Sequence, residues 1–289
     1  MTAPVSAAVI TMGLLSTINR SDVPAHLRQQ MRQFYESSET YKGLLAQHDE
    51  AYLRHFVDLV NRYASPDSRI LEIGCGNGLA AMLLSRCGHR IVGADVSSLF
   101  LKEAKRWENQ RLAYRVCDVF ELPFEAGSFD LVCSNELIEH LPDVETALLE
   151  MIRVTRDGGR VIVSGPNLCS PLMPFLDLLR MIAGKDGRPI WAEKKWQAWQ
   201  STVKNLLLYF NKRFSTRPHF LYREPDLDGP IIGGDADSVY CASPIDLENF
   251  FRLHGLRILK RCVGFGFKGR MMATCFPRLG LYISMVIQR

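Results

Sequence analysis

The sequence of 289 residues lacks several features that define well-known protein classes. Its eight cysteines are scattered and form no CxxC pair, which argues against both a zinc site and a disulfide framework. Several of them lie inside apolar runs, where a reduced thiol packs as a small hydrophobic group. The net charge is only +4, which is too small to indicate nucleic-acid binding by itself. We therefore expect a reducing, cytoplasmic location and no nucleic-acid partner.

The N-terminus also lacks the pattern of a signal peptide or a membrane span. Residues 3–18 are fairly apolar, but they include four hydroxyl residues, and the first basic residue is Arg20. A signal peptide has a positively charged start, and a spanning helix needs about 20 apolar residues. We predict a flexible arm or a packing helix for residues 1–25.

A regular alternation of short apolar runs and amphipathic stretches occupies residues 65–167. Hydrophobic residues make up 47% of the chain and charged residues 23%, which is typical of a folded core. The apolar runs predict strands at 69–73, 90–95, 112–118, 128–135 and 159–166, and the stretches between them predict helices at 78–87, 98–109 and 144–155. Because these strands are apolar nearly throughout, we expect a mostly parallel sheet covered on both faces.

The flanking segments have a different pattern. They predict helices within 26–64 and at 171–184, 191–213 and 243–255, and strands at 256–265 and 279–288. The chain is therefore divided into four parts. They are an N-terminal arm and helices (1–64), a core (65–167), a helical insertion (168–242), and a C-terminal helix with strands that complete the sheet (243–289).

Three alternating glycines follow the first strand, in the stretch ILEIGCGNGL at 70–79. A glycine bend between a strand and a helix lets backbone N–H groups approach a ligand closely. In open parallel sheets, ligands bind beyond the carboxyl ends of the strands. A dinucleotide fingerprint requires GxGxxG, but here position 79 is leucine, and no Walker lysine follows. The spacing departs from the dinucleotide fingerprint, and a nucleoside ligand without a phosphate is the competing interpretation.

The residues after this bend match one family in order and spacing. EIGCGNG (72–78) is followed by Asp95 at the end of the second strand and by Asp118 in VCDVFELPF. FDLVCSNELIEHLPD (129–143) and GGRVIVSGPN (158–167) come next. Over most of 69–166 the chain thus resembles the class I S-adenosylmethionine-dependent methyltransferases, in their small-molecule-type branch (methyltransferase type 11-like).

The resemblance implies a fold and a cofactor, which is S-adenosyl-L-methionine. The fold is α/β and Rossmann-like, a seven-stranded mostly parallel sheet in the order 3-2-1-4-5-7-6. Helices cover both faces, and a helical insertion follows strand 5.

The resemblance also implies which residues bind the nucleoside part of the cofactor. Asp95 would accept hydrogen bonds from both ribose hydroxyls, the task of a carboxylate that only accepts. Asp118 would accept from the adenine amino group, while Val96 and Val119 would pack against the ring.

The methionine part of the cofactor would lie against the bend itself. The residues implied there are Gly74, Gly76, Asn77 and Gly78. Glu72 would orient the loop or meet the cofactor's ammonium group, and Asn135 would offer its carbonyl near the same ammonium.

Methyl transfer from a sulfonium needs an acceptor atom held in line with the methyl carbon in a water-excluding pocket. We expect transfer to an oxygen atom of a small-molecule or lipid-like acceptor. The alternatives are transfer to nitrogen or carbon of a larger acceptor, a non-catalytic binding protein with this fold, and a nicotinamide-dependent oxidoreductase. The Asn/Asp-Pro-Pro-aromatic motif of enzymes that methylate nucleobases or glutamine is not present, since 135–138 reads NELI.

An alcohol acceptor requires a general base, and His140 is our candidate. It follows the fourth strand on the ligand side of the sheet, and a neutral imidazole accepts a proton near neutral pH. The same segment could instead shape the start of the next helix. His219, His254 and Tyr240 are further candidates. Tyr35 and Tyr41 would belong either to a lid or to helix packing.

The segment GGDADS (233–238) could suggest a metal site through Asp235 and Asp237. A turn explains these residues equally well, and the rest of the sequence offers no matching ligand cluster. We predict no metal.

The insertion differs from the rest of the chain in charge. Residues 168–223 contain ten basic and three acidic residues, a formal charge of +7, together with three tryptophans and six other aromatic residues. Three interpretations remain open. The segment could be a helical cap, an acceptor-binding wall, or a patch that makes peripheral contact with a membrane surface.

Overall fold

The fold was obtained as a computed structural model, which describes residues 25–185, 192, 194–227, 236–262, 271 and 273–289. The predictions for residues 1–24, for Asp235 and for the strand beyond residue 262 lie outside the described residues. Within the described ranges, every helix is too short or too polar to cross a bilayer.

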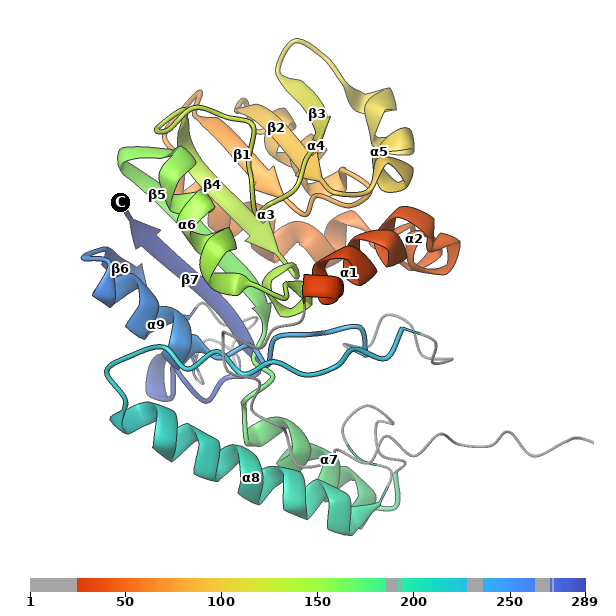
Figure 1. The fold of residues 1–289 in the computed structure, drawn as a ribbon, viewed down its shortest axis with the longest axis vertical. Helices are drawn as coiled ribbons and strands as arrows, with labels where there is room; N and C mark the ends of the chain where they lie inside the picture. The colour runs from red at the N-terminus through yellow and green to blue at the C-terminus, as the bar shows by residue number, and fades with distance from the viewer. Residues whose placement is uncertain (1–24, 186–191, 193, 228–235, 263–270, 272) are drawn as a thin grey trace, which may run out of the picture.

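A seven-stranded sheet forms the centre of the molecule (Figure 1). Its strands are β1 (Arg69–Ile73), β2 (Arg90–Asp95), β3 (Leu112–Val116), β4 (Phe129–Asn135), β5 (Thr155–Pro166), β6 (Arg257–Lys260) and β7 (Tyr282–Gln288). The strand order is β3-β2-β1-β4-β5-β7-β6, and β7 runs antiparallel to both of its neighbours. This confirms the predicted sheet and its order.

The helices also fall near their predicted positions. They are α1 (Ala25–Ser37), α2 (Glu39–Leu45), α3 (Glu50–Tyr63), α4 (Leu79–Arg86), α5 (Ser98–Ala104), α6 (Val144–Val154), α7 (Leu172–Ile182), α8 (Lys195–Phe214) and α9 (Pro244–Leu253). Side chains of Ser38, Asp49, Ser97 and Asp143 cap the starts of α2, α3, α5 and α6. Such caps satisfy N–H groups that the helix itself leaves unpaired.

The apolar strands divide their side chains between two cores. Leu71 and Val132 belong to a cluster that includes α6 and α9, whereas Ile70, Leu131 and Cys133 belong to a cluster that includes α3 and α4. Successive side chains of a strand point to opposite faces of a sheet, so an almost continuous apolar run fills both cores. The sheet is therefore covered on both faces, as predicted.

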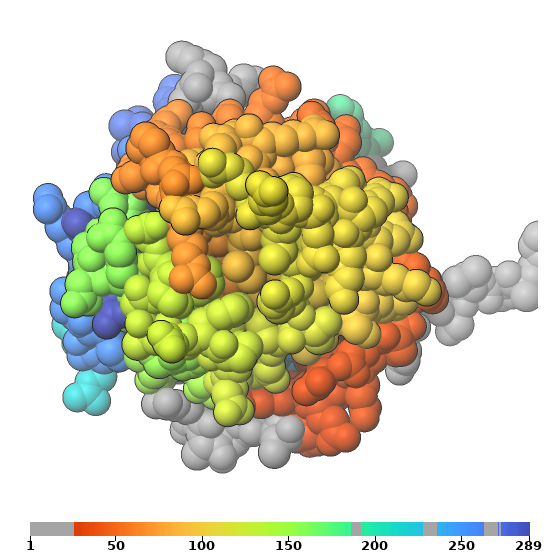
Figure 2. All heavy atoms as spheres, turned by 90° about the horizontal axis from the view of Figure 1, so that it is seen from above, coloured from red at the N-terminus to blue at the C-terminus, as the bar shows by residue number. Residues whose placement is uncertain are grey.

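The insertion after β5 forms a separate end of the molecule. Helices α7 and α8 pack against each other there, beyond the carboxyl ends of the parallel strands (Figure 1). In the view from the opposite end, the first half of the chain makes up most of the face, and α7 and α8 are largely hidden (Figure 2).

Candidate functional site

A pocket lies at the carboxyl ends of β1, β2 and β4, where the glycine bend begins. Its volume is about 1180 Å³, open solvent at its mouth included. Helices α1 and α2 lie across this edge of the sheet (Figure 1). Leu45 of α2 lies against Gly76, and its carbonyl accepts a hydrogen bond of 2.7 Å from the Asn77 side chain. The N-terminal helices thus cover the bend.

The three glycines of the bend have different tasks. All have positive φ, with values of 70° at Gly74, 51° at Gly76 and 77° at Gly78, a region that side chains strongly disfavour. Gly74 and Gly76 line the pocket. Gly78 does not line it, and a Cβ built there would lie 2.6 Å from a ring carbon of Tyr114. The structure therefore places Gly78 in a close packing contact.

Asp95 braces the bend from the end of β2. Its side chain is buried and accepts hydrogen bonds from the backbone N–H groups of Gly76, at 2.8 Å, and Ser97, at 2.9 Å. Burial raises the pKa of Asp95 to about 6. Each carboxylate oxygen has two lone pairs, so both oxygens keep capacity for a ligand hydroxyl. Val96, the next residue, lines the same pocket.

Glu72 has an unsatisfied oxygen inside the pocket wall. Its side chain is buried, and Oε2 has no hydrogen-bond partner among the described residues. Burial first, and then the charge of Asp95, raises the pKa of Glu72 to about 8. A buried polar atom without a partner is costly. This oxygen is therefore placed to receive a ligand donor, and a cationic one would also favour the ionised carboxylate.

The other predicted cofactor residues lie around the same space. Asp118, Val119, Asn77 and Asn135 all line the pocket. The Asp118 side chain accepts a hydrogen bond of 2.9 Å from the backbone N–H of Phe120. The side-chain oxygen Oδ1 of Asn135 accepts one of 2.9 Å from the Tyr282 hydroxyl. The fold thus brings together every predicted cofactor residue except Gly78.

His140 also lines the pocket, and its imidazole lies beside the carboxylate of Asp237. Its Nδ1 is 3.3 Å from Oδ2 of Asp237, and its Nε2 is 3.7 Å from Oε1 of Glu139. The Tyr35 hydroxyl donates to the same Asp237 oxygen at 2.8 Å. Burial, and then the charge of Asp237, raises the pKa of Tyr35 well above its usual range, so the phenol keeps its proton.

Aromatic rings close the wall around His140. Tyr35 and Tyr41 contact its imidazole edge-on, with centroid separations of 5.9 and 6.4 Å, and Phe100 stacks on Tyr41 at 5.8 Å. These rings come from α1, α2 and α5, so three separate elements form one apolar surface. Tyr35 and Tyr41 therefore both pack the helices and line the pocket.

The lining of the pocket contains more acidic than basic side chains. It includes the carboxyl groups of Glu72, Asp95, Asp118 and Glu136, and the guanidinium groups of Arg28 and Arg32. Arg28 pairs with Asp143 and Arg32 with Glu36, so both cations already have anionic partners. Such a lining favours a cationic ligand.

Some residues of this site are not identifiable as such in the sequence. Asp237 can be read as a turn or metal residue, and only the fold places it beside His140. Glu136 has an unusual positive φ of 50°, and its carboxylate accepts a hydrogen bond of 2.8 Å from Tyr52. Strained backbone is often found at functional sites, but it leaves no mark in the sequence. Among the described residues, no cluster of histidine, cysteine and acidic side chains could hold a metal.

The other predicted base candidates lie elsewhere. Tyr240 is fully buried and donates to Asp246, and the backbone N–H of His219 donates to the same carboxylate. His254 caps the end of α9, where its Nδ1 is 2.9 Å from the carbonyl of Phe250. None of the three lines the pocket.

Comparison with known proteins assigns the central part of the chain. Residues 71–163 match the methyltransferase domain family. The tocopherol O-methyltransferase of Arabidopsis thaliana chloroplasts is 30% identical over 143 residues, which cover 45% of this chain and 41% of that protein. A probable S-adenosylmethionine-dependent methyltransferase of Mycolicibacterium smegmatis is 34% identical over 141 residues, or 45% and 54% of the two chains. The chain thus spans about half the length of the curated relatives it matches.

The fold is shared with solved methyltransferase structures. The magnesium protoporphyrin IX methyltransferase of Synechocystis, solved with bound S-adenosylhomocysteine, aligns with a TM-score of 0.55 at 12% identity, over 91% of this chain and 99% of that one. Together with the domain match, this confirms the predicted class I methyltransferase fold.

Proposed function

We propose that this chain, whose residues 71–163 form a class I S-adenosylmethionine-dependent methyltransferase domain, methylates an oxygen atom of a small apolar or lipid-like acceptor. The observation that carries the proposal is the unsatisfied buried oxygen of Glu72, which lies in one acid-rich pocket with Asp95 and Asp118. This arrangement suits a ligand that combines a cation, a ribose and an amino-substituted ring.

The pocket residues fit that cofactor by chemistry. Glu72 would accept from the ammonium group, Asp95 from the ribose hydroxyls and Asp118 from the adenine amino group, with Val96 and Val119 against the ring. When bound, S-adenosylmethionine supplies a methyl group that its sulfonium already activates.

The residues of the chain would then supply acceptor binding and proton removal. Tyr35, Tyr41 and Phe100 exclude water and offer an apolar wall to the acceptor. His140 would take the proton from an acceptor hydroxyl, and the carboxylate of Asp237, 3.3 Å from Nδ1, would orient the ring and favour the imidazolium that forms. Glu139 is a second buried carboxyl beside this ring, with Oε1 3.7 Å from Nε2, and its charge would favour the imidazolium that forms after proton transfer.

The relatives support the reaction class and the kind of acceptor. One is named for O-methylation of tocopherol, and a structural neighbour is named for magnesium protoporphyrin IX. The aromatic wall of this pocket agrees with an acceptor that has a large apolar part.

Cofactor binding can be tested by calorimetry with S-adenosylhomocysteine. Asp95→Ala should weaken binding by about 10²-fold or more, because it removes a charged acceptor of two hydrogen bonds. Asp118→Asn is a milder second variant, since Asp118 accepts only one backbone hydrogen bond. Asp58→Ala, on the exposed side of α3, is the matched control and should bind normally. Normal affinity in both pocket variants would contradict the proposed site.

The reaction can be tested with methyl-labelled cofactor and a panel of apolar phenols, quinols and alcohols. We expect labelled ether products, and we expect His140→Ala to lower kcat by about 10²–10⁴-fold with alcohols. Asp237→Asn should lower kcat less than His140→Ala and leave KM nearly unchanged, because it only orients the imidazole. Labelled amine products, or an unchanged kcat in His140→Ala, would rule out the proposed O-methylation by this base.

A further inference from the structure

Helix α8 carries an apolar stripe on its solvent side. The exposed apolar side chains of this helix are Trp196, Trp199, Val203, Leu206, Leu207, Phe210 and Phe214. At 3.6 residues per turn, all of them fall within an arc of about 100°. The helix has 20 residues and is therefore about 30 Å long, so the stripe runs along almost its entire length.

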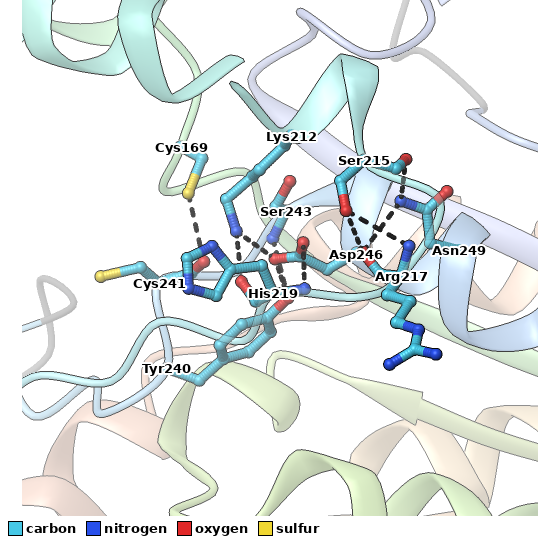
Figure 3. A network of polar contacts seen from close by, with 10 residues as sticks. All are labelled: Cys169, Lys212, Ser215, Arg217, His219, Tyr240, Cys241, Ser243, Asp246 and Asn249. Carbon is cyan, nitrogen blue, oxygen red and sulfur yellow. Dashed lines mark hydrogen bonds and ion pairs between the residues drawn. The ribbon is translucent and has the colours of Figure 1, made fainter. Parts of the chain in front are cut away.

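The inner face of the same helix is unusually polar. Lys212 and Asp246 are both buried and form an ion pair, and the Lys212 ammonium also donates to the His219 carbonyl at 2.6 Å (Figure 3). Two turns earlier, the Asn205 side chain donates to the Ser170 carbonyl at 3.0 Å. A helix of a globular protein normally buries its apolar side and exposes its polar side. In α8 this arrangement is reversed, and the buried ion pair fixes the helix with its apolar stripe outward.

The neighbouring helix adds to the exposed apolar surface. On α7, the exposed apolar side chains are Phe175, Leu176, Leu179 and Ile182. Their spacing places them on one side of that helix. Helices α7 and α8 therefore carry most of the exposed large apolar side chains of the described residues, although they are a small part of the chain.

Among the described residues on and next to the two helices, the exposed charges are basic, while Asp186 and Glu193 between the helices lie outside the described residues. The exposed basic residues on and next to the two helices are Arg180, Lys185, Lys194, Lys195 and Arg213. Asp177 is the one acidic residue among the described residues of α7 and α8, and it is buried. An apolar stripe bordered by positive charges is complementary to a partner that has an apolar interior beneath a negatively charged outer layer.

We propose that α7 and α8 dock onto an anionic membrane surface. The α8 stripe lies at the boundary between headgroups and acyl chains, with its two tryptophans at the interface, and the basic residues contact anionic headgroups. A second copy of this chain is a poorer occupant, because it would bring like charges together. The contact is peripheral, since within the described parts of the chain no helix could span a bilayer. This surface lies outside the cofactor pocket, so the inference stands independently of the proposed reaction.

The experiment measures partitioning of the full chain onto vesicles. Phosphatidylcholine vesicles with and without phosphatidylglycerol are used in flotation, and tryptophan emission is followed in parallel. We expect binding to the anionic vesicles with a blue shift of the emission, and weaker binding at high salt. Leu207→Ser combined with Phe210→Ser should lower the partition coefficient at least about tenfold. Leu253→Ser is the matched control, because Leu253 is exposed to 62% and Leu207 to 65%.

Charge is tested separately from the apolar stripe. Lys195→Gln with Arg213→Gln should reduce partitioning about fivefold for each charge removed. Lys102→Gln with Lys105→Gln, exposed positions near α5, should change it much less. Circular dichroism of each variant checks that it is folded before its partitioning is compared.

Three results would overturn the proposal. They are failure of the wild-type chain to bind anionic vesicles, equal binding by the Leu207/Phe210 variant, and a concentration-dependent dimer in solution that this variant abolishes. The last result would mean that a second copy covers the stripe.

Discussion

Replacing Glu72 by glutamine should make the protein more stable at alkaline pH. In the folded protein the pKa of this buried carboxyl is raised from 4.5 to about 8. A raised carboxyl pKa means that the fold prefers the protonated form. Its contribution to stability is therefore complete below the unfolded value and is lost as the pH rises toward the folded value. Glutamine resembles the protonated form at every pH.

The size of the effect follows from the shift. One pKa unit corresponds to about 1.4 kcal/mol, so the whole shift has an upper limit of about 5 kcal/mol. Asp95, with a raised pKa of about 6, contributes its own loss at lower pH in both proteins. We therefore compare wild type and Glu72→Gln between about pH 6 and pH 8. Over this interval the pKa shift of Glu72 should lower the free energy of unfolding of the wild-type protein by about 2.5 kcal/mol as the pH rises.

The assay is urea unfolding of wild type, Glu72→Gln and Glu125→Gln at several pH values. Glu125 is exposed, so its variant should follow the wild-type curve. The Glu72→Gln curve should be flatter across this interval and lie above wild type at its alkaline end. Parallel curves for wild type and Glu72→Gln would show that Glu72 is already ionised in the fold, and the reasoning from burial would be wrong.

Two further predictions concern the bend and the insertion. Gly78→Ala should lower the free energy of unfolding by about 2–4 kcal/mol, because of the contact with Tyr114 and the positive φ. Gly88→Ala is the control, since Gly88 has a φ of 95° but no atom within 4 Å of an added Cβ, and it should cost only about 1 kcal/mol. Equal losses of stability in thermal unfolding would contradict the packing role of Gly78. Lys212→Met leaves Asp246 buried without its cation and should lower the free energy of unfolding by about 3–5 kcal/mol, as measured by urea unfolding. Lys204→Met is the control. A loss in Lys212→Met no larger than in the control would show that the ion pair does not hold α8.

The positions of the strands could be predicted from local signals in the sequence, whereas the strand order and the residues proposed to bind the cofactor came from the resemblance to methyltransferases. The local signals are simple. Apolar runs fix where strands form, glycines at 74, 76 and 78 mark the bend, and Asp95 and Asp118 stand at strand ends. In a parallel sheet all of these strand ends meet at one edge, so residues far apart in sequence converge without further information.

The roles of Gly78, Asp237 and α8 depended on the tertiary structure. Gly78 looks like its two neighbouring glycines until the ring of Tyr114 is placed against it. Asp237 and His140 lie almost a hundred residues apart, and no local pattern relates them. The apolar spacing of α8 predicts a helix correctly, but periodicity alone does not say which face is buried. The buried ion pair of Lys212 with Asp246 places the polar side of α8 inside the protein, and the apolar stripe therefore faces solvent.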